Sequence, residues 1–253
     1  MQGDPLSCVI LHVPHSSRII PGEVRANIVI DDAEIESELN EMTDTKTDQL
    51  AFIAQRQSTL KPWIFMNTLS RLVIDPERFP DEREVMNSVG MGAVYTRTSR
   101  GNLLRQEPFT GTNILIDTYF TPYSDAFTEL VTSRLDALGR VTIIDVHSYR
   151  TLQHPNSINH DQERPEICIG TDSFHTPENL IQSAQEACTA VGRTELNQPY
   201  AGTYIPLKFY GVDPRVQSIM MEIRADTFVD ENLELSDSHT HVAHALVSLV
   251  NLV

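Results

Sequence analysis

Short apolar runs along the chain alternate with longer stretches in which apolar residues recur at helical spacing. The short runs are rich in Val and Ile and have the length of buried strands. They predict strands at Ser7 to Val13, Trp63 to Met66, Leu72 to Ile74, Val141 to Val146, Ile167 to Ile169 and Ser218 to Ile223. The helical spacing predicts helices at Asp31 to Gln57, either continuous or broken, and at Pro122 to Leu138, Pro177 to Val191 and His241 to Leu252.

Strands that alternate with helices are typical of an α/β fold. We therefore expect one sheet, mixed and mostly parallel, with helices on its faces. No repeat or low-complexity linker divides residues 1–253, which predicts a single domain. The segment from Phe79 to Thr112 has the least regular pattern and is expected to form a long functional loop.

Polar side chains stand at or near the ends of three predicted strands, where ligands bind in open α/β sheets. His15 follows the first strand, His147 follows Val141 to Val146, and Glu222 lies in the apolar run Met-Met-Glu-Ile. Burying an unpaired carboxylate is costly, so a functional Glu222 is favoured over one that faces water from an edge strand. Two imidazoles and a carboxylate are a suitable ligand set for a catalytic zinc ion.

Two acids are candidates for the carboxylate ligand. Asp44 and Asp48 are four residues apart, so a helix would place both on one face. A solvated acidic face is the alternative interpretation, and the spacing does not choose between the two residues.

The charge balance limits the class of partner. With a formal net charge of −16, the surface repels phosphate backbones, and nucleic acid is not an expected partner. An anionic substrate would need local positive charge in such a chain. Arg71, Arg78 and Lys208 stand beside apolar segments and are candidates to bind an anion.

Composition and cysteine usage indicate the cellular setting. The chain has no apolar stretch of membrane-spanning length, and its first residues do not resemble a signal peptide. The chain contains three cysteines and no Cys-x-x-Cys pair, which argues against both a disulfide framework and a cysteine zinc site. We expect a cytoplasmic protein that does not bind membranes.

Other histidines are given structural interpretations. His239, His241 and His244 resemble a metal cluster, but no strand end delivers them to the crevice of the sheet, so we expect a surface or capping feature. His12 lies within the first strand and is expected to pack in the core.

Six motifs occur along the chain in this order: Val-Pro-His-Ser-Ser, Thr-Asp-Thr-Lys-Thr-Asp-Gln-Leu, Ser-Arg-Leu-Val-Ile-Asp-Pro-Glu-Arg, Asp-Val-His-Ser-Tyr, Gly-Thr-Tyr and Met-Met-Glu-Ile-Arg. In this order, across residues 9–228, the chain resembles the N-formylglutamate amidohydrolase family. The resemblance implies a fold similar to zinc carboxypeptidases and acylamino-acid deacylases. It also implies hydrolysis of N-formyl-L-glutamate to formate and glutamate, a reaction of histidine degradation.

The resemblance also implies roles for individual residues. One zinc ion per chain would be held by His15, Asp44 and His147, with Asp44 preferred over Asp48. Glu222 would be the catalytic carboxylate. The three cations would suit a small anionic N-acyl amino acid: Arg71 would stabilise the oxyanion, and Arg78 and Lys208 would hold the substrate carboxylates. The sequence has Glu77 where the family often has Asn, which places a carboxylate beside Arg78.

Several alternatives stay open at this point. The same metal chemistry would serve a deacylase of succinyl, acetyl or carbamoyl amino acids. A serine hydrolase using Ser148 or Ser17 is disfavoured because no Gly-x-Ser-x-Gly motif occurs. A metal-free binding relative is the third alternative, and it gains if neither Asp44 nor Asp48 reaches the site.

Overall fold

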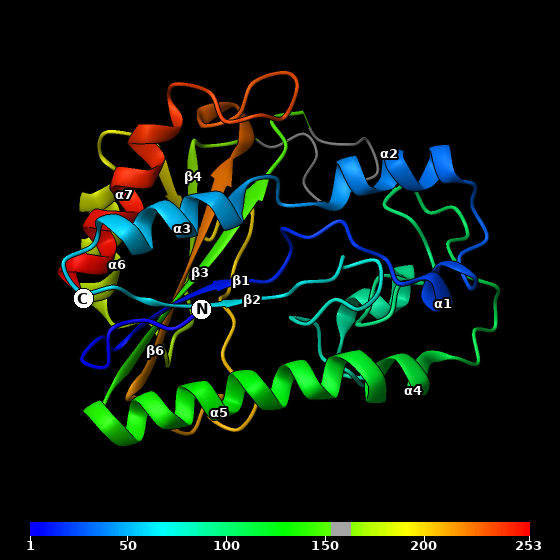
Figure 1. Cartoon of the computed structure of the whole chain (residues 1–253), viewed down its shortest axis with the longest axis horizontal. Helices are drawn as coiled ribbons and strands as arrows, with labels where there is room; N and C mark the ends of the chain where they lie inside the picture. Colours follow the sequence, from blue (N-terminus) through cyan, green and yellow to red (C-terminus); the bar gives the residue numbers. More distant parts are fainter. Residues whose placement is uncertain (153–162) are drawn as a thin grey trace.

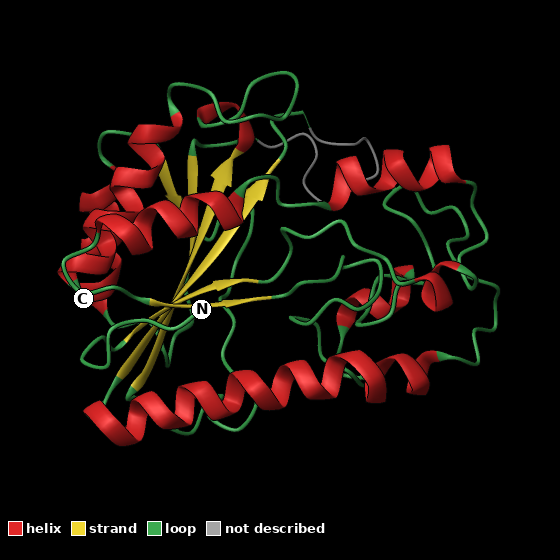
Figure 2. Cartoon of the chain, in the orientation of Figure 1, coloured by secondary structure: helices red, strands yellow, loops and turns green. Residues whose placement is uncertain are grey.

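One mixed β-sheet organises the computed structural model, which describes residues 1–152 and 163–253. Its strands lie in the order β2-β1-β3-β6-β4-β5, and every neighbouring pair is parallel except β4 with β6. The strands are β1 (Val9–Val13), β2 (Trp63–Met66), β3 (Val141–Tyr149), β4 (Ile167–Gly170), β5 (Thr194–Leu196) and β6 (Val216–Arg224). Helices flank the sheet on both faces, as Figures 1 and 2 show, so the predicted α/β class is confirmed.

The helices divide between the two faces of the sheet. Helices α3 (Thr47–Gln57), α6 (Glu178–Cys188) and α7 (His239–Leu252) share one hydrophobic core with the sheet, and α5 (Thr121–Leu138) packs on the opposite face. The remaining helices are α1 (Gly22–Arg25), α2 (Asp32–Met42) and α4 (Thr112–Leu115). They lie beyond the end of the sheet (Figure 1). None of the described helices is long and apolar enough to cross a membrane.

The predicted helix at 31–57 is broken into α2 and α3. The first helix begins with a capping box between Asp31 and Glu34, and Thr43 ends it in an extended conformation. Lys46 then takes a left-handed conformation, with φ of 63°, immediately before α3. The break places Asp44 in a buried connection rather than on a helix face.

One predicted strand is wrong. Residues 71–73 form a turn. Leu72, Val73 and Ile74 do not join the sheet but are buried against residues of the segment from Phe79 to Thr112, called the irregular segment below. The guanidinium of Arg105 donates to the Leu72 carbonyl at 2.6 Å, so a side chain replaces a ladder hydrogen bond. A short apolar run does not distinguish a buried turn from a buried strand, because both exclude water.

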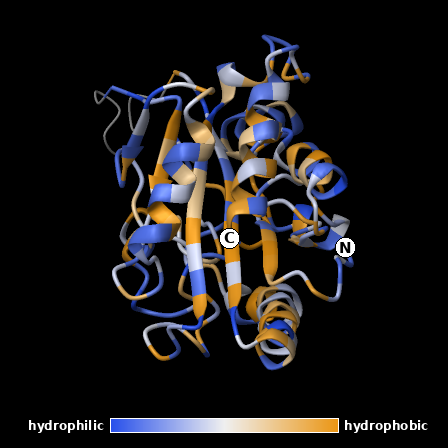
Figure 3. Cartoon of the chain, turned by 90° about the vertical axis from the view of Figure 1, so that its left-hand side faces the viewer, coloured by the Kyte–Doolittle hydropathy of each residue, from blue (hydrophilic) through white to orange (hydrophobic). Residues whose placement is uncertain are grey.

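The sheet face that carries α5 is apolar at one end and polar at the other. Ile10, Val141, Ile143 and Val216 pack on α5. Side chains alternate between the faces of a strand, so residues two positions further along project from the same face. His12 on β1, Asp145 and His147 on β3 and Glu222 on β6 therefore share this face at its carboxyl end. Figure 3 shows largely hydrophobic strands between helices in which hydrophobic and hydrophilic residues are mixed.

We predict that the packing of α5 supports this polar end. Phe127 is fully buried, and its ring lies 4.5 Å from Phe65 and 4.6 Å from His12 between centroids. Phe127→Ala should lower the free energy of unfolding by about 3–5 kcal/mol in urea denaturation, because it leaves a large cavity. Val212, which is 70% exposed, is the control, and Val212→Ala should change stability by less than about 0.5 kcal/mol. Equal effects of the two variants would contradict this view of the core.

Candidate metal and active site

Three side chains of types that can bind a metal ion meet at the carboxyl end of the sheet. His15 follows β1, Asp44 lies between α2 and α3, and His147 lies near the end of β3. All three are buried, and one ligand atom from each lies within 4.8 Å of the others. The structure thus brings together the trio that the sequence predicts. Asp48, the alternative acid, does not line this site.

The topology of the sheet explains why these residues meet. From β1 the chain continues to β2 on one side, whereas β3 pairs with β1 on its other side and is followed along the chain by β4, which lies beyond β6. Loops that leave two adjacent strands in opposite directions open a crevice between them. The backbone N–H of Asp44 donates to the carbonyl of His15 at 3.0 Å, which fixes the connection between α2 and α3 against this crevice.

The ligand atoms converge on one position. His147 Nδ1 lies 2.9 Å and His15 Nδ1 lies 3.6 Å from Asp44 Oδ2. His15 Nδ1 is buried and has no hydrogen-bond partner in the described part of the chain. Burial alone would raise the pKa of Asp44, but the hydrogen bond from His147 and the electrostatic attraction of both imidazoles outweigh it and hold this pKa below its usual range. Two imidazole nitrogens around an ionised carboxylate are a donor set that fits zinc and leaves a fourth position open.

A second carboxylate, Asp75, fixes the orientation of His15. Asp75 Oδ1 lies 2.9 Å from His15 Nε2, and Asp75 Oδ2 accepts from Arg71 Nη2 and from the Tyr95 hydroxyl, both at 2.6 Å. Burial would raise the pKa of Asp75, but Arg71 and His15 hold it well below its usual range. A carboxylate on Nε2 favours the tautomer in which His15 Nδ1 keeps its lone pair for a metal.

Glu222 lies beside the trio on β6. Its backbone is in register with His147 on β3, and its Oε2 atom is enclosed without a hydrogen-bond partner in residues 1–152 and 163–253. Burial raises the pKa of Glu222 to about 7; His147 opposes this shift, and Asp44 and Glu77 reinforce it. A carboxyl group with a pKa near neutrality can both take and return a proton.

A cavity of about 900 Å³ opens onto these groups. Arg71 and Arg78 line it, together with His15, Asp44, His147 and Glu222. The structure does not bring Lys208 to this cavity: its Nζ lies 3.1 Å from the Thr132 hydroxyl on α5, and its side chain is exposed. Residues 207–210 form a turn, in which neighbouring side chains point in different directions. Leu207 and Tyr210 therefore line the cavity, and Lys208 does not.

Four further polar residues contribute to the site without having been predicted from the sequence. Asp75 contacts His15, the Tyr95 hydroxyl donates to Asp75, and Asp145 Oδ1 lies 3.1 Å from His147 Nε2. His12, predicted to pack in the core, is fully buried, but its Nδ1 lies 2.8 Å from Asp145 Oδ1. Two of these residues, His12 and Asp145, could have been predicted from strand periodicity, because residues two apart on β1 and β3 lie on the same face as the site.

The histidines near the C-terminus lie elsewhere. His241 and His244 are exposed on α7, and His239 Nδ1 contacts the Ser236 carbonyl at 2.6 Å.

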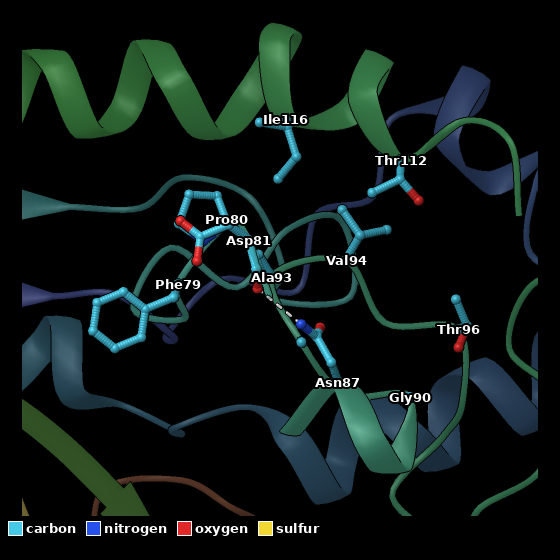
Figure 4. A pocket seen from close by; sticks show the side chains of 11 residues that line it. Phe79, Pro80, Asp81, Asn87, Gly90, Ala93, Val94, Thr96, Thr112 and Ile116 are labelled. Atoms are coloured by element: carbon cyan, nitrogen blue, oxygen red, sulfur yellow. Dashed lines mark hydrogen bonds between the residues drawn. The ribbon is translucent and has the colours of Figure 1, made fainter. Parts of the chain in front are cut away.

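A second, smaller cavity of about 230 Å³ lies between the loop after Phe79 and the helical segment at Thr112 to Ile116 (Figure 4). Its polar contacts are structural: the Asn87 side chain donates to the Asp81 carbonyl at 2.9 Å. The chemistry is therefore assigned to the larger cavity.

Comparisons with known proteins identify the family and support the fold. A model of the N-formylglutamate amidohydrolase family matches residues 7–229. No curated protein sequence gives a match. The fold is similar to the crystal structure of an N-formylglutamate amidohydrolase from Ralstonia eutropha, with a TM-score of 0.76 and 20% identity, covering 97% of this chain and 92% of that one. A gene product from Agrobacterium tumefaciens is also similar, with a TM-score of 0.71 and 18% identity, covering 98% and 92%. Because the family model covers most of its length, the chain belongs to the N-formylglutamate amidohydrolase family of hydrolases.

Proposed function

We propose that this protein is a zinc-dependent amidohydrolase that removes the acyl group of a small anionic N-acyl amino acid. N-formyl-L-glutamate is the substrate that we favour, and formate and glutamate are its products. The observation that carries the proposal is the buried trio of His15, Asp44 and His147 with Glu222 beside it. Family membership supports the reaction class.

The residues divide the chemistry between them. His15, Asp44 and His147 would hold the zinc ion, which supplies Lewis acidity to the amide carbonyl and to water. Glu222 takes a proton from the attacking water and returns it to the leaving nitrogen. Its raised pKa of about 7 suits both steps near neutral pH. The bond that breaks is the amide C–N bond, and water supplies the oxygen of formate and the proton of the amine.

The two arginines have different environments. Arg71 is tied to Asp75 and Tyr95 and presents a fixed positive charge at the cavity wall, suited to the oxyanion that forms at the carbonyl. The Arg78 side chain is 32% exposed, and its Nε lies 3.6 Å from Asp75 Oδ2. Its Nη1 lies 3.8 Å from Glu84 Oε1, and its Nη2 would suit a substrate carboxylate. Lys208 has no part in this proposal because it lies outside the cavity.

The size of the cavity favours a second candidate substrate class. About 900 Å³ is near the upper end for small-molecule sites, and formylglutamate would fill only part of it. Met42, Met86, Met91 and Met220 line the wall. Methionine side chains adapt to different shapes. An amino acid carrying a larger acyl group, such as succinyl, is therefore the alternative.

We predict that zinc binding and turnover can be separated by substitution. His147→Ala should lose zinc and activity together, because it removes a ligand. Glu222→Gln should keep zinc and lower kcat by about 10²–10⁴-fold, because only the proton transfer is lost. Elemental analysis and release of glutamate from N-formyl-L-glutamate measure the two effects. Wild-type protein that binds no supplied zinc, or full turnover by Glu222→Gln, would refute the proposal.

We predict that a panel of substrates will identify the acyl group that the enzyme prefers. Formyl, acetyl, succinyl and carbamoyl derivatives of glutamate should be hydrolysed with different kcat/KM values, and the formyl compound should be the best. In Arg78→Met, KM should rise for all four compounds because each has the same amino acid carboxylates. A preference for succinyl would move the assignment to the alternative class, and an unchanged KM would remove Arg78 from the substrate site.

We predict that Asp75 sets zinc affinity through His15. Asp75→Asn should weaken zinc binding by about 10–100-fold in a competition assay with a chelating dye, because His15 loses its orienting carboxylate. Tyr95→Phe is the matched control: it removes one hydroxyl that contacts Asp75 but keeps the carboxylate on His15. It should weaken binding less. Thermal unfolding of metal-free protein separates this effect from a loss of folding, and equal affinities in wild type and Asp75→Asn would contradict it.

A further inference from the structure

A second group of metal-binding side chains adjoins the proposed zinc site. His12 on β1, Asp145 on β3 and Glu77, in the turn after Asp75, offer one ligand atom each within 4.8 Å of one another. Asp145 and Glu77 line the large cavity, so this group faces the same space as the zinc trio. His12 and Asp145 are fully buried.

The far ends of two of these side chains are fixed by other contacts. His12 Nε2 lies 2.6 Å from the Tyr123 hydroxyl on α5, and the backbone N–H of Tyr204 donates to Asp145 Oδ2 at 3.1 Å. His12 Nδ1 and Asp145 Oδ1 are thereby left facing each other at 2.8 Å. The zinc trio has the same arrangement, in which His147 Nδ1 lies 2.9 Å from Asp44 Oδ2. Outer contacts of this kind orient ligands around a metal.

Two polar atoms at this group lack hydrogen bonds. Glu77 Oε1 is buried without a partner in the described part of the chain, and it lies 3.6 Å from His12 Nδ1. His147, which is 3% exposed, likewise has no hydrogen bond at Nε2 within the described ranges. This nitrogen points at the group, 3.1 Å from Asp145 Oδ1 and 3.3 Å from Glu77 Oε2. Buried polar atoms without partners are costly unless a ligand satisfies them.

The local charge also requires compensation. Asp44, Glu77 and Asp145 surround the site, whereas Arg71 is paired with Asp75, and Arg78 with Asp75 and Glu84. The ion pairs of Glu77 and Asp145 within the described residues are with histidines, which carry charge only when protonated. One divalent cation offsets two of these carboxylates. The third remains in a low-dielectric environment, where uncompensated charge is strongly destabilising.

We propose that His12, Glu77 and Asp145 hold a second divalent cation next to the zinc ion of the proposed function, on which this inference rests. One imidazole and two carboxylates suit zinc or manganese. Paired metal ions in hydrolases polarise the reacting carbonyl and activate water at the same time. The second ion would also supply the positive charge that an anionic substrate needs in a site rich in carboxylates.

The test is the metal stoichiometry of the full chain. Metal-free protein is dialysed against zinc, freed of unbound metal and measured by elemental analysis, with isothermal titration calorimetry as a second readout. Wild type should bind about two zinc ions per chain. Glu77→Gln and His12→Gln should each bind about one, because the first trio is intact. Glu41→Gln is the matched control: Glu41 lines the same cavity but contacts Arg100 and Arg150, so this variant should bind as wild type does.

Each other outcome is decisive. One zinc ion in wild type together with amidohydrolase activity would overturn the second site and leave the proposed function standing. Wild-type stoichiometry in both Glu77→Gln and His12→Gln would place the second ion elsewhere and also overturn the inference. A wild-type chain that binds no zinc would overturn the proposed function as well. Circular dichroism and melting of the metal-free variants show whether each is folded, and the use of two variants keeps the test valid if one is not.

Discussion

The buried carboxylate of Asp75 joins the parts of the molecule on which the site depends. It contacts His15 from the loop after β1, Arg71 from the adjacent turn, and Tyr95 from the irregular segment. Removing one partner of a buried ion pair is strongly destabilising, because the other charge is left without compensation. The three segments are therefore held in one arrangement. The orientation of His15, and with it the position available to a metal, follows from that arrangement.

The irregular segment is held in place by side chains rather than by regular secondary structure. Arg105 is fully buried and donates to the carbonyls of Tyr95 and Leu72. Glu84 accepts from the backbone N–H groups of Phe79 and Met86, and Glu38 accepts from that of Ser99. Buried backbone groups must find partners, and here charged side chains supply them. A cavity wall can therefore be built from loops without losing its shape.

Different parts of the molecule were predictable from the sequence to different degrees. Five of the six strands follow from the periodicity of the sequence, whereas the short β5 (Thr194–Leu196) was not predicted. The trio of His15, Asp44 and His147 follows from the order of motifs through the family resemblance, because spacing alone left Asp44 and Asp48 open. Leu72 to Ile74 was misread because the Arg105 contact that replaces a strand ladder is 33 residues away. Lys208 was misplaced because a turn decides which of its neighbours face the cavity. The roles of Asp75 and His12 depend on long-range pairs, 60 residues for His15 with Asp75 and 133 for His12 with Asp145, which a single sequence does not reveal.

The division of one sheet face explains how the core and the site coexist. On β3, Val141 and Ile143 pack on α5, whereas Asp145 and His147 continue the same row of side chains into the cavity. On β6, Val216 begins the row that ends at Glu222. The apolar half is rigidly packed against α5. Because the polar side chains lie on the same strands, this packing also fixes their positions. The polar half concentrates carboxylates, and the two arginines that line the cavity are paired with Asp75, so the proposed cation would complement the charge of the site. The proposed anionic substrate would then bind where the protein alone would repel it.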